Sequence, residues 1–235
     1  MNDALSADSH PIGTLNEGPL HARLKAWYAQ PGDQPEVWLD GFVVDLLRGE
    51  QIIEIQTAGF ASIRDKVRTI VADHPLQLVY PVAREKWIVK VDEDGQSPLS
   101  RRKSPKRGRV EEVFAELVSF PELLAHPNFA LEVLLVQEEE VRRYDGSRAW
   151  RRRGWITQER RLLQVVGSHL FKGPADMARL VPGHVAEPFT TADLARAAGF
   201  GRRLAQKMAY CLRKMGALQV CGKAGRALLY VRSTT

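Results

Sequence analysis

Asp45, Glu54 and Gln56 interrupt the two apolar runs that flank Gly49-Glu50 in the stretch VVDLLRGEQIIEIQ, residues 43–56. Gly49 begins a two-residue turn near its middle, and glycine at this position is typical of a type II′ β-hairpin. The hairpin places Asp45 directly opposite Glu54, with Cβ atoms about 5 Å apart. Gln56 lies two residues beyond Glu54 and therefore shares the same face of the strand.

Opposed carboxylates repel one another and destabilise a hairpin unless a positive group lies between them. Mg²⁺ is a natural candidate, because it prefers oxygen ligands and often binds one or two carboxylates together with substrate phosphates. Asp45 and Glu54 are therefore candidate metal ligands. The alternative is a solvated sheet face on which Arg48 or another basic group neutralises the two acids.

Asp45 followed by Glu54-Ile55-Gln56 resembles the core motif of the PD-(D/E)XK nuclease superfamily, in which Gln56 stands in place of the usual lysine. The resemblance implies Mg²⁺- or Mn²⁺-dependent hydrolysis of DNA. Asp45, Glu54, the Ile55 carbonyl and Glu17 on the preceding helix would hold the metal, and Gln56 would position the attacking water. An amide cannot supply the positive charge of a lysine, so a DNA-binding protein that has lost catalysis is the alternative function.

The elements expected around this motif follow the order helix, three strands, helix, strand. The resemblance covers residues 14–92 and implies an α/β fold with a restriction-endonuclease-like αβββαβ core. The first helix, from Glu17, carries Leu20, Leu24 and Trp27 on one face, the spacing of an apolar helical stripe.

Two basic side chains on the flanking helices could belong to the site. His21 lies one turn beyond Glu17, where it could face the carboxylates or lie on the helix surface. Lys66 lies on the expected second helix, residues 62–74, where it could contact a phosphate or be solvated.

The remainder of the expected first domain, residues 14–171, is less regular. Residues 76–82 and 86–92 are predicted as separate strands, and 129–141 as a strand or strand pair. Residues 96–109 contain six Lys and Arg and no acid, which predicts a mobile loop. Residues 160–171 are predicted as a helix.

Residues 172–235 form a second predicted domain. They hold 11 Lys and Arg against 3 Asp and Glu, which suggests a polyanionic partner. A short helix, a turn at Gly199, a longer helix from Arg202 and a strand pair predict a winged helix-turn-helix. Winged helices also mediate protein contacts, so a protein-interaction adaptor is a further possibility.

DNA is the expected partner, and a homodimer is possible. The candidate nucleic-acid-binding residues are basic or amide side chains in four segments. They are Arg202, Arg203, Gln206 and Lys207 on the longer helix, Lys223 and Arg226 at the wing, Arg101, Arg102 and Lys103 in the basic loop, and Arg151 and Arg152 in an Arg- and Trp-rich segment.

Composition narrows the class of protein. The chain has 235 residues and two cysteines, Cys211 and Cys221, which argues against a disulfide scaffold or a zinc finger. No apolar run approaches the length of roughly 20 residues that spans a bilayer. These features predict a cytoplasmic, nucleoid-associated protein.

Overall fold

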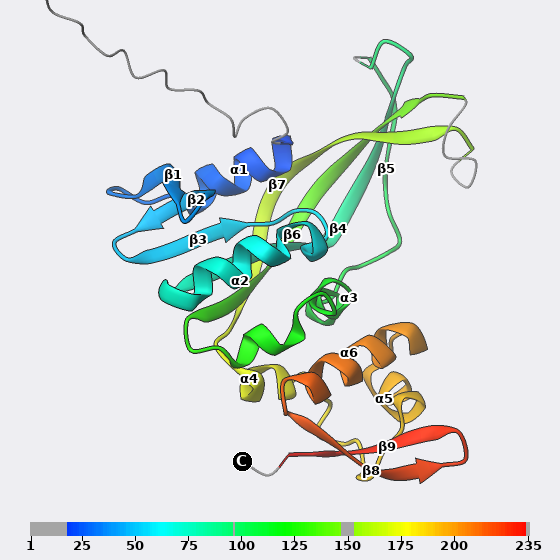
Figure 1. The fold of residues 1–235 in the computed structure, drawn as a ribbon. Coiled ribbons are helices and arrows are strands. Elements are labelled where there is room, and N and C mark those ends of the chain that lie inside the picture. The colour runs from blue at the N-terminus through cyan, green and yellow to red at the C-terminus, as the bar shows by residue number, and fades with distance from the viewer. Residues whose placement is uncertain (1–17, 96, 147–152, 234–235) are drawn as a thin grey trace, which may run out of the picture.

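A computed structural model of the chain describes residues 18–95, 97–146 and 153–233. The described residues have a mixed α/β fold built on a seven-stranded sheet of order β1-β2-β3-β4-β6-β7, with β5 paired to β4 (Figure 1). The strands are β1 (Gln34–Leu39), β2 (Phe42–Arg48), β3 (Gln51–Ile55), β4 (Leu76–Val91), β5 (Pro98–Lys103), β6 (Phe129–Tyr144) and β7 (Trp155–Phe171).

Helices cover both faces of the sheet near β3. Helix α1 (Pro19–Tyr28) buries Leu20 and Leu24 against Leu46, Ile53 and Ile55 on one face. Helix α2 (Arg64–Asp73), preceded by the 3₁₀ turn η2 (Phe60–Ile63), buries its apolar stripe on the other face. Trp27, predicted to share a face with Leu20 and Leu24, is 52% exposed and does not belong to this core.

The strands change direction on either side of β3. Strands β1, β2 and β3 pair antiparallel, whereas β3 and β4 pair parallel across the α2 connection. A parallel pair requires a crossover, and a helix is the usual one. The described chain therefore begins in the order helix, three strands, helix, strand, as predicted.

The prediction of a helix over 160–171 is wrong, because β7 runs through that segment and pairs antiparallel with β6. Apolar pairs at Leu162-Leu163 and Val165-Val166 are compatible with a helical stripe. In the fold, however, the edge of β6 would leave its backbone N–H and C=O groups without hydrogen bonds, and pairing with β7 supplies those bonds. Register shifts along the pair place Leu162 and Val165 against the core beside α1.

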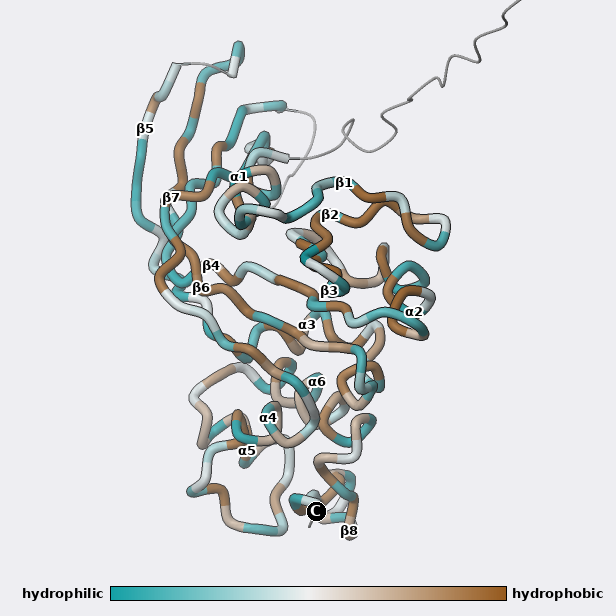
Figure 2. Tube along the Cα trace, turned by 90° about the vertical axis from the view of Figure 1, so that its left-hand side faces the viewer, coloured by the Kyte–Doolittle hydropathy of each residue, from teal (hydrophilic) through white to brown (hydrophobic). Residues whose placement is uncertain are grey.

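The predicted loop at 96–109 is also partly wrong. Residues 98–103 form β5, whose side chains are exposed and which pairs with the outer half of β4. Figure 2 shows β5 as a largely hydrophilic strand. The two strands expected at 76–82 and 86–92 are one strand, β4, with an irregularity between Ala83 and Glu85 against β6.

The C-terminal part contains α4 (Pro174–Ala178), α5 (Thr191–Ala198), α6 (Arg202–Lys214), β8 (Leu218–Ala224) and β9 (Ala227–Arg232). Thr190 and Asp193 form a capping box at the start of α5, which satisfies free amides of the first turn. Gly199 ends α5 with φ of 67°, a conformation that glycine adopts without strain. The predicted order of helix, turn, helix and hairpin is therefore present.

One apolar core continues from the sheet into the C-terminal part. It includes η3 (Val110–Val113), α3 (Phe114–Leu117) and η4 (Pro121–Ala125). From α6 it takes Met208, Cys211 and Leu212, all fully buried. The inner face of α6 is thus packed on the α3 region.

Candidate active site

Asp45 and Glu54 occupy the point where β2 and β3 separate. Gly49 has φ of 59°, as a type II′ turn requires, and the strand pairs run from Arg48–Gln51 to Leu46–Ile53. Asp45 and Glu54 come next in this register. The Asp45 amide lies 3.4 Å from Glu54 Oε2, and Asp45 Oδ2 accepts a 2.7 Å hydrogen bond from the Ile55 amide. Asp45 and Glu54 therefore lie close together, but the ladder ends at Leu46–Ile53 and does not include the predicted direct pair of Asp45 with Glu54.

Each carboxylate has a basic partner from a different helix. His21 Nε2, on α1, lies 3.1 Å from Asp45 Oδ2. The Lys66 ammonium, on α2, forms an ion pair with Glu54 and also donates to the Val43 carbonyl at 2.7 Å. The sequence did not decide whether these two basic side chains face the site or the solvent, because helical spacing alone does not reveal which strand lies beneath a helix.

Burial and mutual repulsion separate the pKa values of the two acids. The Glu54 side chain is only 7% exposed, and this burial, together with the Asp45 charge, raises the pKa of Glu54 to about 7. Burial also opposes ionisation of Asp45, but its hydrogen bond to His21 and the charge of His21 outweigh it and lower the pKa of Asp45. One acid is therefore ionised near neutral pH while the other titrates there, a pattern common at functional sites.

Gln56 does not face the carboxylate pair as expected. The Gln56 amide nitrogen donates to the Gly59 carbonyl and to Ser62 Oγ, both at 3.1 Å. These contacts direct it toward the loop before α2 and not toward the carboxylate pair. Glu17 lies outside the described residues.

The oxygen atoms of Asp45 and Glu54 are ligands of the type that a divalent cation binds. Two adjacent carboxylates supply hard oxygen ligands of the kind Mg²⁺ takes together with water and phosphate. Within residues 18–95, 97–146 and 153–233, no group of three or more His, Cys, Asp and Glu side chains is arranged to hold a metal ion. Any further ligands would therefore come from backbone, water or substrate.

A small cavity reaches His21 but is lined by neither carboxylate. A cavity of about 220 Å³ lies beside the start of α1, lined by His21, Thr57 and Arg160 among others. Arg160 donates to the Thr57 carbonyl at 3.1 Å and so connects β7 to the chain that leaves β3. The cavity brings solvent to the His21 side of the site.

The predicted nucleic-acid-binding residues of β5 lie on an exposed strand. Arg101 pairs with Glu139 at 2.7 Å and lies over the Trp87 ring. Lys103 pairs with Glu85 at 2.8 Å, and Arg102 occupies the alternate position on β5. Arg151 and Arg152 lie outside the described residues.

The predicted residues of α6 divide between two sides of the helix. Arg202 and Gln206 line a small cavity with Arg226 of the β8–β9 turn. Arg203 and Lys207 line a larger cavity that faces the sheet, where Lys207 donates to the Ala115 carbonyl at 2.9 Å. The four candidate residues of the longer helix therefore do not share one surface. Lys223 lies exposed on β8.

Comparison with protein families gives a match over residues 18–172 to the family described as "Domain of unknown function (DUF8091)". The chain is a member of the DUF8091 family. The DUF8091 region contains His21, Asp45, Glu54 and Lys66, and it ends one residue beyond β7.

A relative of this DUF8091 protein occurs in Treponema pallidum (strain Nichols), where it is described as an uncharacterized protein. The two are 30% identical over 220 residues, which cover 93% of this chain and 86% of the relative. The alignment therefore extends into the C-terminal part. No solved structure matches this DUF8091 chain. Among the described residues, no helix is long and apolar enough to cross a membrane.

Proposed function

We propose that the protein is a metal-dependent nuclease that hydrolyses phosphodiester bonds in DNA. The observation that carries the proposal is the adjacency of Asp45 and Glu54 where β2 and β3 separate, with the Lys66 ammonium on Glu54. The order helix, three strands, helix, strand around this pair supports the resemblance to the PD-(D/E)XK superfamily.

Asp45 and Glu54, with the Ile55 carbonyl, would hold Mg²⁺ or Mn²⁺. Such an ion lowers the pKa of a water nucleophile and offsets charge on a phosphate. The chain orients Asp45 through two hydrogen bonds, from the Ile55 amide and from His21. A carboxylate held at both contacts loses little rotamer freedom when a ligand binds, which favours a defined geometry.

Lys66 supplies the charge that Gln56 lacks. Its ammonium reaches the carboxylate pair from α2, whereas the motif position after Ile55 carries a neutral amide directed at Gly59 and Ser62. A cation beside a reacting phosphate stabilises the negative charge that develops in the transition state. In this proposal Lys66 contacts a phosphate oxygen, and His21 positions Asp45.

DNA binding in this proposal uses the exposed basic residues of β5 and of the winged-helix arrangement at the C-terminus. Each phosphate that the protein neutralises should lower log K by roughly 0.9 per unit of log salt concentration. Replacing Lys223 and Arg226 by glutamine should therefore reduce the salt slope by up to about two units. The full chain is the proper material, because α6 shares its core with the first 171 residues.

Cleavage assays test the nuclease proposal directly. Plasmid, linear duplex, single-stranded and branched DNA are incubated with Mg²⁺ or Mn²⁺ and with wild type, Asp45→Asn or Glu54→Gln protein. We expect wild-type cleavage that both substitutions abolish while circular dichroism shows a retained fold. Cleavage that persists in both variants would exclude this pair as the catalytic site.

A non-catalytic DNA-binding protein is the second candidate. It is favoured by the burial of Glu54 and by the hydrogen bonds that already occupy both carboxylates. This candidate predicts DNA affinity without cleavage of any of the four substrates in either metal.

A further inference from the structure

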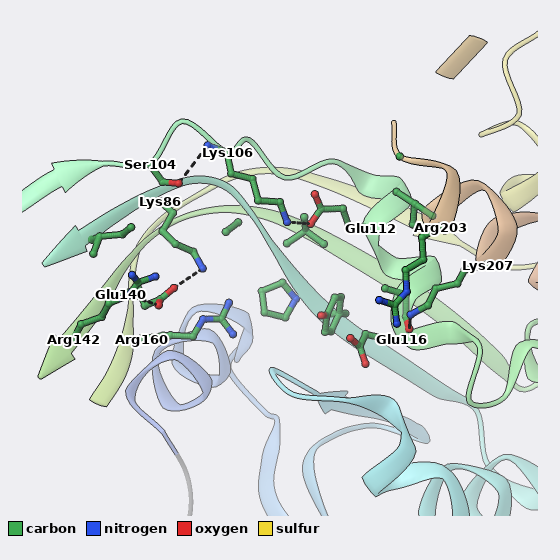
Figure 3. A pocket seen from close by; sticks show the side chains of 18 residues that line it. Lys86, Ser104, Lys106, Glu112, Glu116, Glu140, Arg142, Arg160, Arg203 and Lys207 are labelled. Atoms are coloured by element: carbon green, nitrogen blue, oxygen red, sulfur yellow. Dashed lines mark hydrogen bonds and ion pairs between the residues drawn. The ribbon is translucent and has the colours of Figure 1, made fainter. Parts of the chain in front are cut away.

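A second cavity lies apart from the carboxylate pair. It has a volume of about 650 Å³ and is enclosed by β4, β6 and β7, the segment around Ser104 and Lys106, α3 and the start of α6 (Figure 3). None of His21, Asp45, Glu54 or Lys66 lines it. Its volume lies within the range of roughly 300–1,000 Å³ that small-molecule sites occupy.

The cavity is rich in positive charge. Three of its carboxylates are Glu112, Glu116 and Glu140, and the buried Glu138 pairs with two of its basic side chains. Its six basic side chains are Lys86, Lys106, Arg142, Arg160, Arg203 and Lys207. Six cations against four carboxylates leave a formal excess of two positive charges, close to the negative charge of about 1.5 to 2 on a phosphate monoester at pH 7.

Most of the charge on the strand side is already paired. Glu140 accepts from Lys86 and Arg142, both at 2.8 Å, and Arg160 pairs with Glu138 at 2.5 Å. Lys86 also lies 3.0 Å from Glu138. These bonds make the strand side a fixed wall.

On the opposite side of the cavity, helix α6 carries basic side chains that can donate hydrogen bonds to a ligand. Arg203 and Lys207 are one helical turn apart on α6 and point into the cavity, opposite Arg142 and Arg160 in Figure 3. Within the part of the chain that the structure describes, Arg203 makes no ion pair, and Lys207 uses a single donor, to Ala115. Gly201, which also lines the cavity, provides no side-chain cap for the first amides of α6.

Apolar groups line the space between these two sides. They come from Pro81, Val82 and Ile88 on β4 and from Leu204 on α6, with Tyr80 beside them. Burial raises the pKa of the Tyr80 phenol to about 12, so its hydroxyl stays protonated and can donate a hydrogen bond. An apolar wall with a few polar groups beside a cationic end suits a nucleobase joined to a phosphate.

We propose that this cavity binds a nucleotide, with its phosphate monoester against Arg203 and Lys207 and its base against the apolar wall of β4. The ligand is either a free nucleoside monophosphate or the 5′-phosphorylated end of a nucleic-acid strand, which share this chemistry. The proposal does not depend on hydrolysis at the Asp45–Glu54 pair.

Calorimetric titration of the full chain in EDTA tests the proposal, because without a divalent metal cleavage at the other site cannot contribute. The probes are 2′-deoxyadenosine 5′-monophosphate, deoxyadenosine, inorganic phosphate, and a hexanucleotide with or without a 5′-phosphate. Arg203→Gln is compared with Arg213→Gln, a control with the same change of charge at an exposed position in the last turn of α6, outside this cavity.

We expect the monophosphate to bind more tightly than deoxyadenosine or phosphate. Arg203→Gln should weaken it about tenfold, the effect of losing one charge-assisted hydrogen bond, and Arg213→Gln less than twofold. A phosphorylated hexanucleotide that binds more tightly than the free nucleotide identifies a strand end as the ligand, and the reverse order identifies a free nucleotide. Absence of monophosphate binding at millimolar concentration, or equal weakening by both substitutions, would overturn the proposal.

Discussion

The Lys66 ammonium forms an ion pair with the Glu54 carboxylate and thereby joins helix α2 to strand β3. Both side chains are largely buried, with exposed fractions of 14% for Lys66 and 7% for Glu54. Glu54 also has a like charge nearby on Asp45, so Lys66 offsets repulsion within the carboxylate pair. Glu54, a predicted metal ligand, therefore contacts the ammonium of Lys66, whereas the motif position that usually carries lysine holds the neutral Gln56.

Replacing Lys66 by methionine should reduce the single-turnover rate of DNA cleavage by about 100-fold or more, the usual effect of removing one transition-state donor. DNA affinity should change by less than threefold, because one charge among many is lost. Lys25→Met is the control, since Lys25 pairs with the exposed Glu36 at 3.0 Å. Equal rates for wild type and Lys66→Met would remove Lys66 from the mechanism.

The cleavage rate should depend on pH through Glu54. A metal ligand must be deprotonated, and the pKa of Glu54 is raised to about 7 by burial and by the Asp45 charge. At limiting Mg²⁺ the rate should therefore rise about fivefold between pH 6 and 7 and about tenfold between pH 6 and the plateau above pH 8. Higher Mg²⁺ should move the midpoint to lower pH, because the metal competes with the proton. A rate that is flat from pH 6 to 8 contradicts this role.

Stability should depend on pH in the opposite direction. The pKa of Glu54 is higher in the folded state than the ordinary value of 4.5, so protonation stabilises the fold at low pH. This contribution is complete below about pH 4.5 and is lost as pH rises through about 7. Thermal unfolding should show wild type losing stability between about pH 5 and 7 relative to Glu54→Gln, and little further loss above pH 8. Glu93→Gln, at an exposed position, should follow wild type. Parallel curves for wild type and Glu54→Gln would contradict the assignment.

Gly108 should tolerate no side chain. A Cβ there would lie 2.4 Å from the Ala83 carbonyl oxygen, a backbone atom that cannot move aside easily. Gly108→Ala should destabilise the protein by about 1–3 kcal/mol, the usual cost of overpacking. Gly183→Ala is the control, because a Cβ at that position has no neighbour within 4 Å. Chemical denaturation measures both, and equal midpoints would show that the segment before η3 can shift.

Local patterns in the sequence determined the hairpin and its acids. Glycine at position 49 specifies the turn, and a two-residue turn leaves one register, which ends with Leu46 opposite Ile53 and so brings Asp45 and Glu54 to the end of the ladder. The helix–turn–helix–hairpin order at the C-terminus could be predicted for the same reason, since Thr190 begins α5 and Gly199 ends it through contacts a few residues long.

Tertiary structure decided the features that depend on distant segments. Residues 160–171 are a strand because β6 presents an open edge, and their own pattern of paired apolar residues did not specify it. Lys66 and His21 reach the carboxylates because α2 and α1 pack on opposite faces of the same strands. Arg203 and Arg202 face different cavities because α6 buries Met208 and Leu212 in a core shared with the sheet. Spacing along the chain specifies which residues share a face, but only packing decides what that face meets.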